Sequence, residues 1–157
     1  MGNTELRVAC PSFGADGRMP KRHTGFGEDV SPEIVVGGIG RGVASLAVVM
    51  DDLDVPLAGE LTHWLIWNLP PDGVIPEGVP VGAQCENGAR QGLAYGRYRY
   101  RGPKQPLFIR KAHRYRFCVY ALDGMLTLPQ NARKTALLAA MAGHVLQTGE
   151  IVGWYRR

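Results

Sequence analysis

The order of hydrophobic and polar positions predicts strands along most of this chain. Residues 5–10 (ELRVAC) alternate between polar and apolar side chains, as a half-buried strand does. The apolar runs at 34–36 and 45–50 (SLAVVM) predict two further strands, the second buried on both faces. The aromatic and branched stretch THWLIWNLP (62–70) predicts a fourth, which two prolines bring to an end.

The strand expected at 114–122 begins with ionisable side chains. Successive side chains of a strand point to opposite faces, so His113 and Tyr115 share a face with the apolar Phe117. Arg114 and Arg116 lie on the other face. The apolar face of this strand therefore carries a histidine and a tyrosine at its open end.

Residues 131–147 predict the one helix, because alanine is abundant and apolar side chains recur at helical spacing. Asn131 is the expected N-cap and Gly149 the expected C-terminal stop. A last strand is expected at 150–157. The connection at 71–112 shows little periodicity, and the short strands that a segment of this length can contain are not placed by the pattern.

Strands that come first, with one helix late, favour a mainly β fold and a β-sandwich over an alternating α/β fold. The 157 residues, of which 45% are hydrophobic and 20% charged, suit a single folded domain over 1–157. The N-terminal MGNTELRVAC has charged residues where a signal peptide needs an apolar core, and no apolar stretch is long enough to span a bilayer. The expected location is cytoplasmic. The widely spaced Cys10, Cys85 and Cys118 predict free thiols.

The net charge of +4 is unevenly distributed, since every charged residue between Glu86 and Asp123 is basic. Basic residues interleaved with tyrosines, as in 90–116, are typical of a surface that binds nucleic acid or another anion. The alternative is a solvated face whose arginines pair with acids elsewhere in the fold. We favour this second interpretation, so nucleic acid is not the expected partner.

Ionisable side chains lie where three of the predicted strands begin or end. Asp52 and Asp54 follow the apolar run and are expected on one face, with Asp51 on the other. His63 begins the next strand, and His113 precedes Tyr115 by two residues. Each has an ordinary structural explanation, such as an acidic turn, but their coincidence at strand ends indicates one site.

The types of residue restrict the chemistry of that site. No HxH or HExxH spacing is present, so no metal or cofactor is expected. No GxSxG motif marks a nucleophile. Phosphate binding by histidine and tyrosine donors, with aspartates that orient the rings and keep them cationic, fits best.

Three motifs carry a resemblance to a known family. DDLDVP (51–56) is similar to the family's DPDAP, HWLIWNLP (63–70) to a histidine that begins a strand ending in Asn-Leu-Pro, and YRGP (100–103) with HRYRFCVYALD (113–123) to its Tyr-x-Gly-Pro and His-Arg-Tyr segments. In this order they resemble the phosphatidylethanolamine-binding protein family, which includes the Raf kinase inhibitor proteins and plant flowering regulators. Small bacterial and archaeal members are the most similar, and the resemblance runs from about residue 10 to the end.

The resemblance implies a β-sandwich of two antiparallel sheets with a C-terminal helix, and a pocket for phosphate or a phospholipid head group. The implied ligand-binding residues are Asp52, Asp54, His63, Pro103, His113 and Tyr115. Both histidines would donate to the anion and Tyr115 would add a hydroxyl. The two aspartates would orient the histidines or meet a ligand amine.

The resemblance also implies a non-enzymatic binder that modulates a kinase or protease, and it is compatible with a homodimer. Two alternatives stay open: a small hydrolase that uses His63 or His113 as general base, and a nucleic-acid binder that uses 90–116. The chain departs from the family at Leu53, where the motif has proline, and at 104–112 (KQPLFIRKA), which is longer and more basic. Such a rim would favour larger anionic ligands, for instance a phosphorylated protein.

Overall fold

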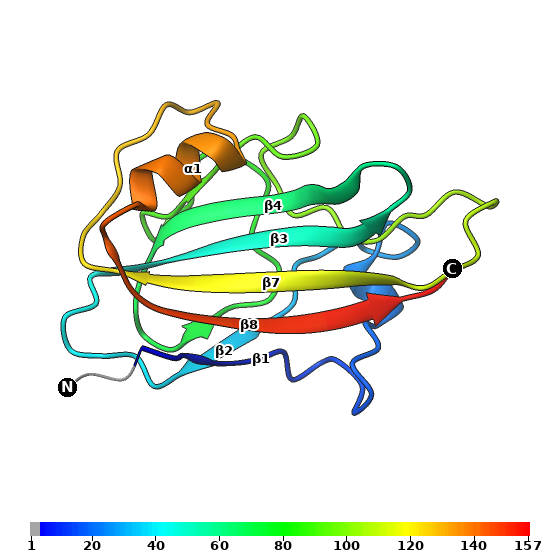
Figure 1. Ribbon diagram of the computed structural model, residues 1–157, viewed down its shortest axis with the longest axis horizontal. Helices are drawn as coiled ribbons and strands as arrows, with labels where there is room; N and C mark the ends of the chain where they lie inside the picture. The colour runs from blue at the N-terminus through cyan, green and yellow to red at the C-terminus, as the bar shows by residue number, and fades with distance from the viewer. Residues whose placement is uncertain (1–3) are drawn as a thin grey trace.

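Antiparallel strands dominate the computed structural model of the chain, which describes residues 4–157 (Figure 1). The larger sheet has five strands in the order β6 (Arg90–Gln91), β4 (Gly59–Leu69), β3 (Ser45–Val55), β7 (His113–Leu122) and β8 (Val145–Tyr155). The smaller sheet has three, in the order β1 (Arg7–Ala9), β2 (Ile34–Gly37) and β5 (Val74–Ile75). All paired strands within the sheets are antiparallel. The prediction of a mainly β fold with two antiparallel sheets is confirmed.

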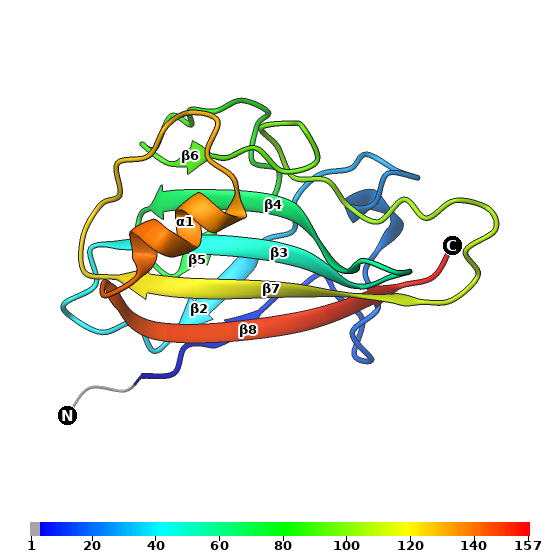
Figure 2. The same cartoon turned by 45° about the horizontal axis from the view of Figure 1, so that its top comes forward.

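The central strand β3 is buried on both of its faces, as its continuous apolar run predicts. Leu46, Val48 and Met50 belong to the core that includes residues of the smaller sheet, such as Ile34. Ala47 and Val49 belong to a second apolar cluster together with residues of the helix α1 (Lys134–Met141). The helix lies over one face of the larger sheet, at one end of the molecule (Figure 2).

The predicted helix at 131–147 is too long, since α1 covers only Lys134–Met141. Asn131 is not its N-cap, because the helix begins after Arg133, which makes no side-chain capping hydrogen bond. The chain leaves the helix through Gly143, whose φ of 82° is a left-handed conformation that glycine adopts readily.

The last strand begins earlier than predicted, at Val145 and not at Glu150. Its residues pair with β7 over nearly the whole length of that strand, from His113 opposite Tyr155 to Leu122 opposite Val145. Gly149 therefore lies inside a strand and does not end the helix. The backbone hydrogen bonds that β8 makes along β7 outweigh the weak helical preference of these residues.

Several segments meet at the end of the sandwich that also holds the C-terminus (Figures 1 and 2). The strand β3 continues beyond its predicted end and β4 begins before its predicted start, so the two strands form a hairpin around residues 55–59. The beginning of β7 and the connection 101–112 lie at the same end. A one-turn 3-10 helix, Lys21–His23, contributes His23, whose carbonyl accepts a hydrogen bond from Tyr100 Oη (2.7 Å). This end of the sandwich is where the predicted site residues gather.

Two further expectations can be compared with the structure. Cys10, Cys85 and Cys118 are free thiols, as predicted. Within residues 4–157, no helix has the length and apolar character needed to cross a membrane.

Candidate functional site

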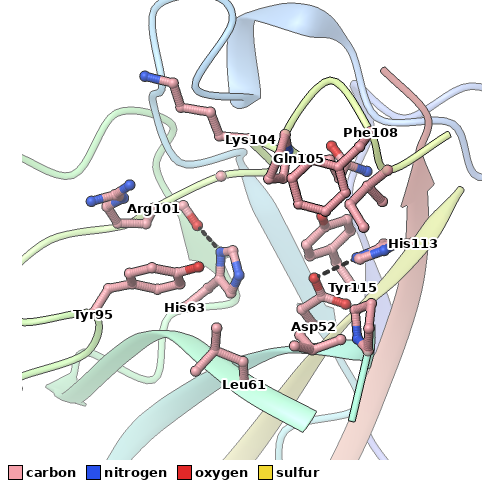
Figure 3. A pocket seen from close by; sticks show the side chains of 15 residues that line it. Asp52, Leu61, His63, Tyr95, Arg101, Lys104, Gln105, Phe108, His113 and Tyr115 are labelled. Carbon is pink, nitrogen blue, oxygen red and sulfur yellow. Dashed lines mark hydrogen bonds and ion pairs between the residues drawn. The ribbon is translucent and has the colours of Figure 1, made fainter. Parts of the chain in front are cut away.

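A cavity of about 350 Å³ opens at this end of the larger sheet (Figure 3). Its walls come from the ends of β3, β4 and β7 and from the connection that leads to β7. Asp52, His63, His113 and Tyr115 all line it. The sequence analysis therefore identified residues that the fold brings together from three separate strands.

Asp52 and His113 form a buried pair on one side of the cavity. The His113 ring donates from Nδ1 to Asp52 Oδ2 at 2.8 Å, and both side chains are less than a tenth exposed. In the antiparallel register of β3 and β7, Asp52 lies opposite Tyr115. The residue before Tyr115 in β7, Arg114, is exposed. The second carboxylate oxygen, Oδ1, accepts the backbone N–H of Asp54 (2.9 Å). Asp52 thus fixes the His113 ring with its proton on Nδ1.

His63, which the resemblance implies donates to an anion, uses one of its ring nitrogens within the protein. Its Nδ1 donates to the backbone carbonyl of Arg101 at 2.7 Å, so the ring proton is engaged within the protein. Burial lowers the pKa of His63, which keeps the ring neutral with a lone pair on Nε2. Tyr95 and Tyr115 hold the ring edge-on, with centroids 4.9 and 5.5 Å away.

Tyr115 is buried next to this pair. Desolvation and the neighbouring Asp52 carboxylate raise the pKa of Tyr115 well above its ordinary value, so the phenol stays neutral. A neutral phenol beside a carboxylate can act as a hydrogen-bond donor.

Asp54 lies outside the cavity. Its carboxylate accepts two hydrogen bonds from the Arg114 guanidinium (2.9 and 3.0 Å) and one from the Arg114 backbone N–H (2.7 Å). This contact lowers the pKa of Asp54. Asp52 and Asp54 do not share a site as expected, because the pairing of β3 with β4 is irregular between Asp52 and Val55.

Asp51 points away from Asp52, as strand alternation predicts. Its carboxylate accepts hydrogen bonds from Thr62 (2.7 Å), Lys134 (2.8 Å) and Arg116 (3.2 Å). Asp51 thus joins β3 to β4, β7 and α1 on the opposite face of the sheet, and it takes no part in the cavity.

Pro103 does not line the cavity, but its neighbours Gly102 and Lys104 do. The Gly102 N–H donates to Asp29 Oδ1 (2.7 Å), and a β-carbon at residue 102 would collide with the carbonyl oxygen of His23. This close approach explains the glycine of the YRGP motif. Pro103 accepts a hydrogen bond from the Gly25 N–H at 2.8 Å and so anchors the segment behind the wall.

The sequence analysis missed cavity residues that the connections contribute. Tyr95 occupies a tight turn with Gly96, has a φ of 54°, and carries the Arg101 guanidinium 4.7 Å from its ring centroid. Gln105 donates from Nε2 to the carbonyl of Tyr155 (2.9 Å), and Phe108 adds an apolar wall. The Tyr-Gly pair indicates a turn, but no sequence signal shows that this turn packs against His63.

Two groups of basic residues in the segment 90–116 bear on the interpretation of this segment. Arg99 pairs with Asp29, Arg114 with Asp54, and Arg116 with Asp51 and Glu60, which supports the interpretation of a face that pairs with acids elsewhere in the fold. A second group around the cavity mouth makes no ion pair with any residue from 4 to 157. It consists of Lys104, Arg110 and Lys111. These three cations define the basic mouth.

In the described part of the chain, residues 4–157, no three His, Cys, Asp or Glu side chains are grouped so that they could hold a metal ion. What the arrangement offers is hydrogen bonding and charge: a buried carboxylate–imidazole pair, a neutral imidazole, a phenol and a basic mouth.

The comparisons with known proteins identify a single family. Residues 10–156 match the family model described as phosphatidylethanolamine-binding protein. The UPF0098 protein of Pyrococcus abyssi is 40% identical over 99% of this chain and 88% of its own length. The UPF0098 protein of Methanothermobacter thermautotrophicus is 41% identical over 97% of this chain and 99% of its own.

Solved structures share the fold. A crystal structure titled as a putative phosphatidylethanolamine-binding protein homologue from Chlamydia trachomatis has a TM-score of 0.84 at 32% identity and covers 99% of both chains. Escherichia coli YbcL, titled as a new member of the mammalian family, has a TM-score of 0.82 at 24% identity and covers 98% of this chain and 99% of its own. The second likeness concerns the fold alone.

Proposed function

Because this chain belongs to the phosphatidylethanolamine-binding protein family, we propose that it is a non-enzymatic binder of small anionic ligands of the phosphate or phosphoethanolamine type. The proposed site is the cavity between Asp52, His63, His113 and Tyr115. Its volume of about 350 Å³ is at the small end of the range for ligand pockets, which suits a head group better than a whole lipid.

The buried Asp52–His113 pair is the observation that carries the proposal. Nδ1 of His113 is held by the Asp52 carboxylate at 2.8 Å, which fixes the orientation of the ring and leaves Nε2 free of Asp52. A ring held in a fixed orientation by a buried carboxylate is a suitable hydrogen-bonding partner for an anion, since hydrogen bonds to a charged group are about twice as strong as neutral ones.

The basic mouth supports the same function from outside. Lys104 lines the cavity, and Arg110 and Lys111 line an adjoining groove that also contains His113. Cations without acidic partners attract an anion towards the entrance and lower the cost of removing its water. These cations would also allow the site to bind a larger anionic partner, such as a phosphorylated segment of a kinase or of another protein.

Titration calorimetry with phosphoethanolamine tests the proposal. We expect saturable binding by the wild type and none by His113→Ala. The triple variant Lys104→Gln, Arg110→Gln, Lys111→Gln should bind roughly threefold to tenfold more weakly and with a smaller dependence on salt.

A matched triple variant controls for net charge. Arg41, Arg90 and Arg133 are exposed and lie outside the cavity, so their replacement by glutamine removes the same charge at a distance and should leave the affinity unchanged. Absence of binding by the wild type would refute the proposed function. Equal affinities of the two triple variants would refute the role of the basic mouth.

A further inference from the structure

The N–H donors of the buried side chains His113, His63 and Gln105 are used within the protein. His113 Nδ1 is directed at Asp52, and His63 Nδ1 is directed at the Arg101 carbonyl. The Gln105 amide nitrogen donates to the carbonyl of Tyr155 (2.9 Å). An anion inside the cavity would find few of these donors free.

Two acceptors, by contrast, have no partner. Three buried side-chain nitrogen or oxygen atoms of residues 4–157 lack any hydrogen-bond partner, and two of them, His63 Nε2 and Gln105 Oε1, belong to side chains that line this cavity (Figure 3). Both residues are only 4% exposed. A buried polar atom without a partner destabilises the folded protein, so two on one cavity indicate a ligand that satisfies them.

The chemical identity of both atoms follows from their bonded neighbours. A backbone carbonyl can only accept, so the nitrogen that faces the Arg101 carbonyl carries a proton, and in the neutral ring that burial favours Nε2 carries a lone pair. For the same reason the nitrogen of Gln105 faces the Tyr155 carbonyl, and its oxygen is the free atom. Together with the Asp52 carboxylate, these atoms make the cavity rich in acceptors.

We infer that the cavity selects anions that carry their own hydrogen-bond donors, and that the donor end of the ligand meets His63 Nε2 and Gln105 Oε1 while its negative charge faces His113 and the basic mouth. This inference rests on the proposed function and specifies its ligands. The donor is either the hydroxyl of a protonated phosphate or the ammonium of a phosphorylated amine. A fully deprotonated anion offers no donor and leaves both atoms unsatisfied.

Inorganic phosphate and sulfate separate this inference from attraction by charge alone. At neutral pH every phosphate ion retains at least one proton and sulfate retains none, although the two have the same shape. Charge alone would favour the dianionic sulfate. We expect phosphate to bind at least about tenfold more tightly, because a site built to accept hydrogen bonds rejects an analogue without the donor.

A second pair of ligands identifies the donor. Phosphoethanolamine and ethyl phosphate share the phosphate, and only the first has an ammonium group. Tighter binding of phosphoethanolamine would place the ammonium against the two acceptors. Equal binding of both, with sulfate still weak, would place the phosphate hydroxyl there.

Replacement of Gln105 tests the assignment within the chain. Gln105→Met removes the free oxygen at similar volume, and it should lower the affinity for phosphate towards that for sulfate while leaving sulfate unchanged. Gln147→Met is the matched control, because Gln147 is also a buried glutamine bonded to backbone groups, at Gly38 and Gly40, and does not line the cavity. The Gln147→Met variant should still bind phosphate more tightly than sulfate.

The outcomes are distinct. Sulfate bound as tightly as phosphate by the wild type would overturn the inference and leave anion binding itself intact. Discrimination that is unchanged in Gln105→Met would overturn the role of Gln105 in it. Failure of all four ligands to bind would overturn both the inference and the proposed function.

Discussion

At the scale of single residues, Asp52 is the centre of the site. One carboxylate oxygen accepts from His113 Nδ1 and the other from the Asp54 backbone N–H, so one buried side chain orients the imidazole and shapes the end of β3. Asp54, two residues later, binds the exposed Arg114 instead. Two aspartates of one motif therefore have different tasks, one inside the cavity and one on the surface.

Asparagine substitutions should separate these two tasks. Asp52→Asn leaves the buried His113 without its charged partner, and we expect it to lower the free energy of unfolding by about 3 kcal/mol. Asp54→Asn, the matched control, should cost much less, because its partner is exposed to solvent. Urea unfolding of both variants measures the difference. Equal losses of unfolding free energy in the two variants would show that the buried pair contributes no more to stability than the exposed pair.

The residues of the site divide into those that the sequence predicts and those that it does not. His63, His113 and Tyr115 could be predicted because strand alternation puts them on buried faces next to apolar neighbours. Gln105 and Tyr95 could not, because loop residues have no periodicity and their position depends on what the loop packs against. The exclusion of Asp54 depends on an irregularity in strand pairing that no local pattern shows.

At the scale of elements, the competition between helix and strand near the C-terminus decides the shape of the larger sheet. The alanine-rich segment forms α1 only as far as Met141, and Gly143 turns the chain with a φ of 82°. The following residues then pair with β7. Without this turn, β7 would have no neighbour on one side, and the strand that carries His113 would be an exposed edge.

Gly143→Ala tests the importance of the turn. A β-carbon at residue 143 would meet no atom within 4 Å, so any cost comes from the left-handed backbone alone. We expect the free energy of unfolding to fall by about 1–2 kcal/mol, as measured by thermal or urea unfolding. Gly124→Ala, which is equally open but not left-handed, should be nearly neutral. A similar stability of the two variants would contradict this explanation of the turn.

The strands were easier to predict than the helix for a physical reason. A continuous apolar run such as 45–50 is buried whatever surrounds it, so burial alone fixes it as a core element. Residues 142–149 contain no such run, and their conformation is decided by the backbone hydrogen bonds that β7 offers. These bonds join residues about thirty positions apart in the chain, which short-range patterns do not register.

At the scale of the whole molecule, two buried neutral histidines link stability to pH. His23 donates from Nδ1 to the Val30 carbonyl (2.9 Å) and lies 2.8 Å from Ser12 Oγ through Nε2, and burial lowers its pKa. The pKa of His63 is lowered for the same reason. In the unfolded chain both should titrate near their ordinary pKa of about 6.5.

Stability should therefore decrease on mild acidification. Below about pH 6.5 the unfolded chain takes up protons that the folded chain refuses, so the free energy of unfolding falls as the pH is lowered from there to about 5. The urea midpoint, measured at several pH values in this range, gives the slope of stability against pH. The slope should be smaller in His23→Gln than in the wild type. A midpoint that rises on acidification would contradict the neutral assignment.

The most direct test of the account follows the histidine rings by NMR during a titration with phosphoethanolamine. The chain has only four histidines, and His23 and His144 lie outside the cavity, so they serve as internal controls. We predict saturable shifts of the His63 and His113 ring signals, no shift of the other two, and no shift of His63 in His113→Ala. Rings of His63 and His113 that do not respond, or four rings that respond alike without saturation, would contradict the assignment of this cavity as the binding site.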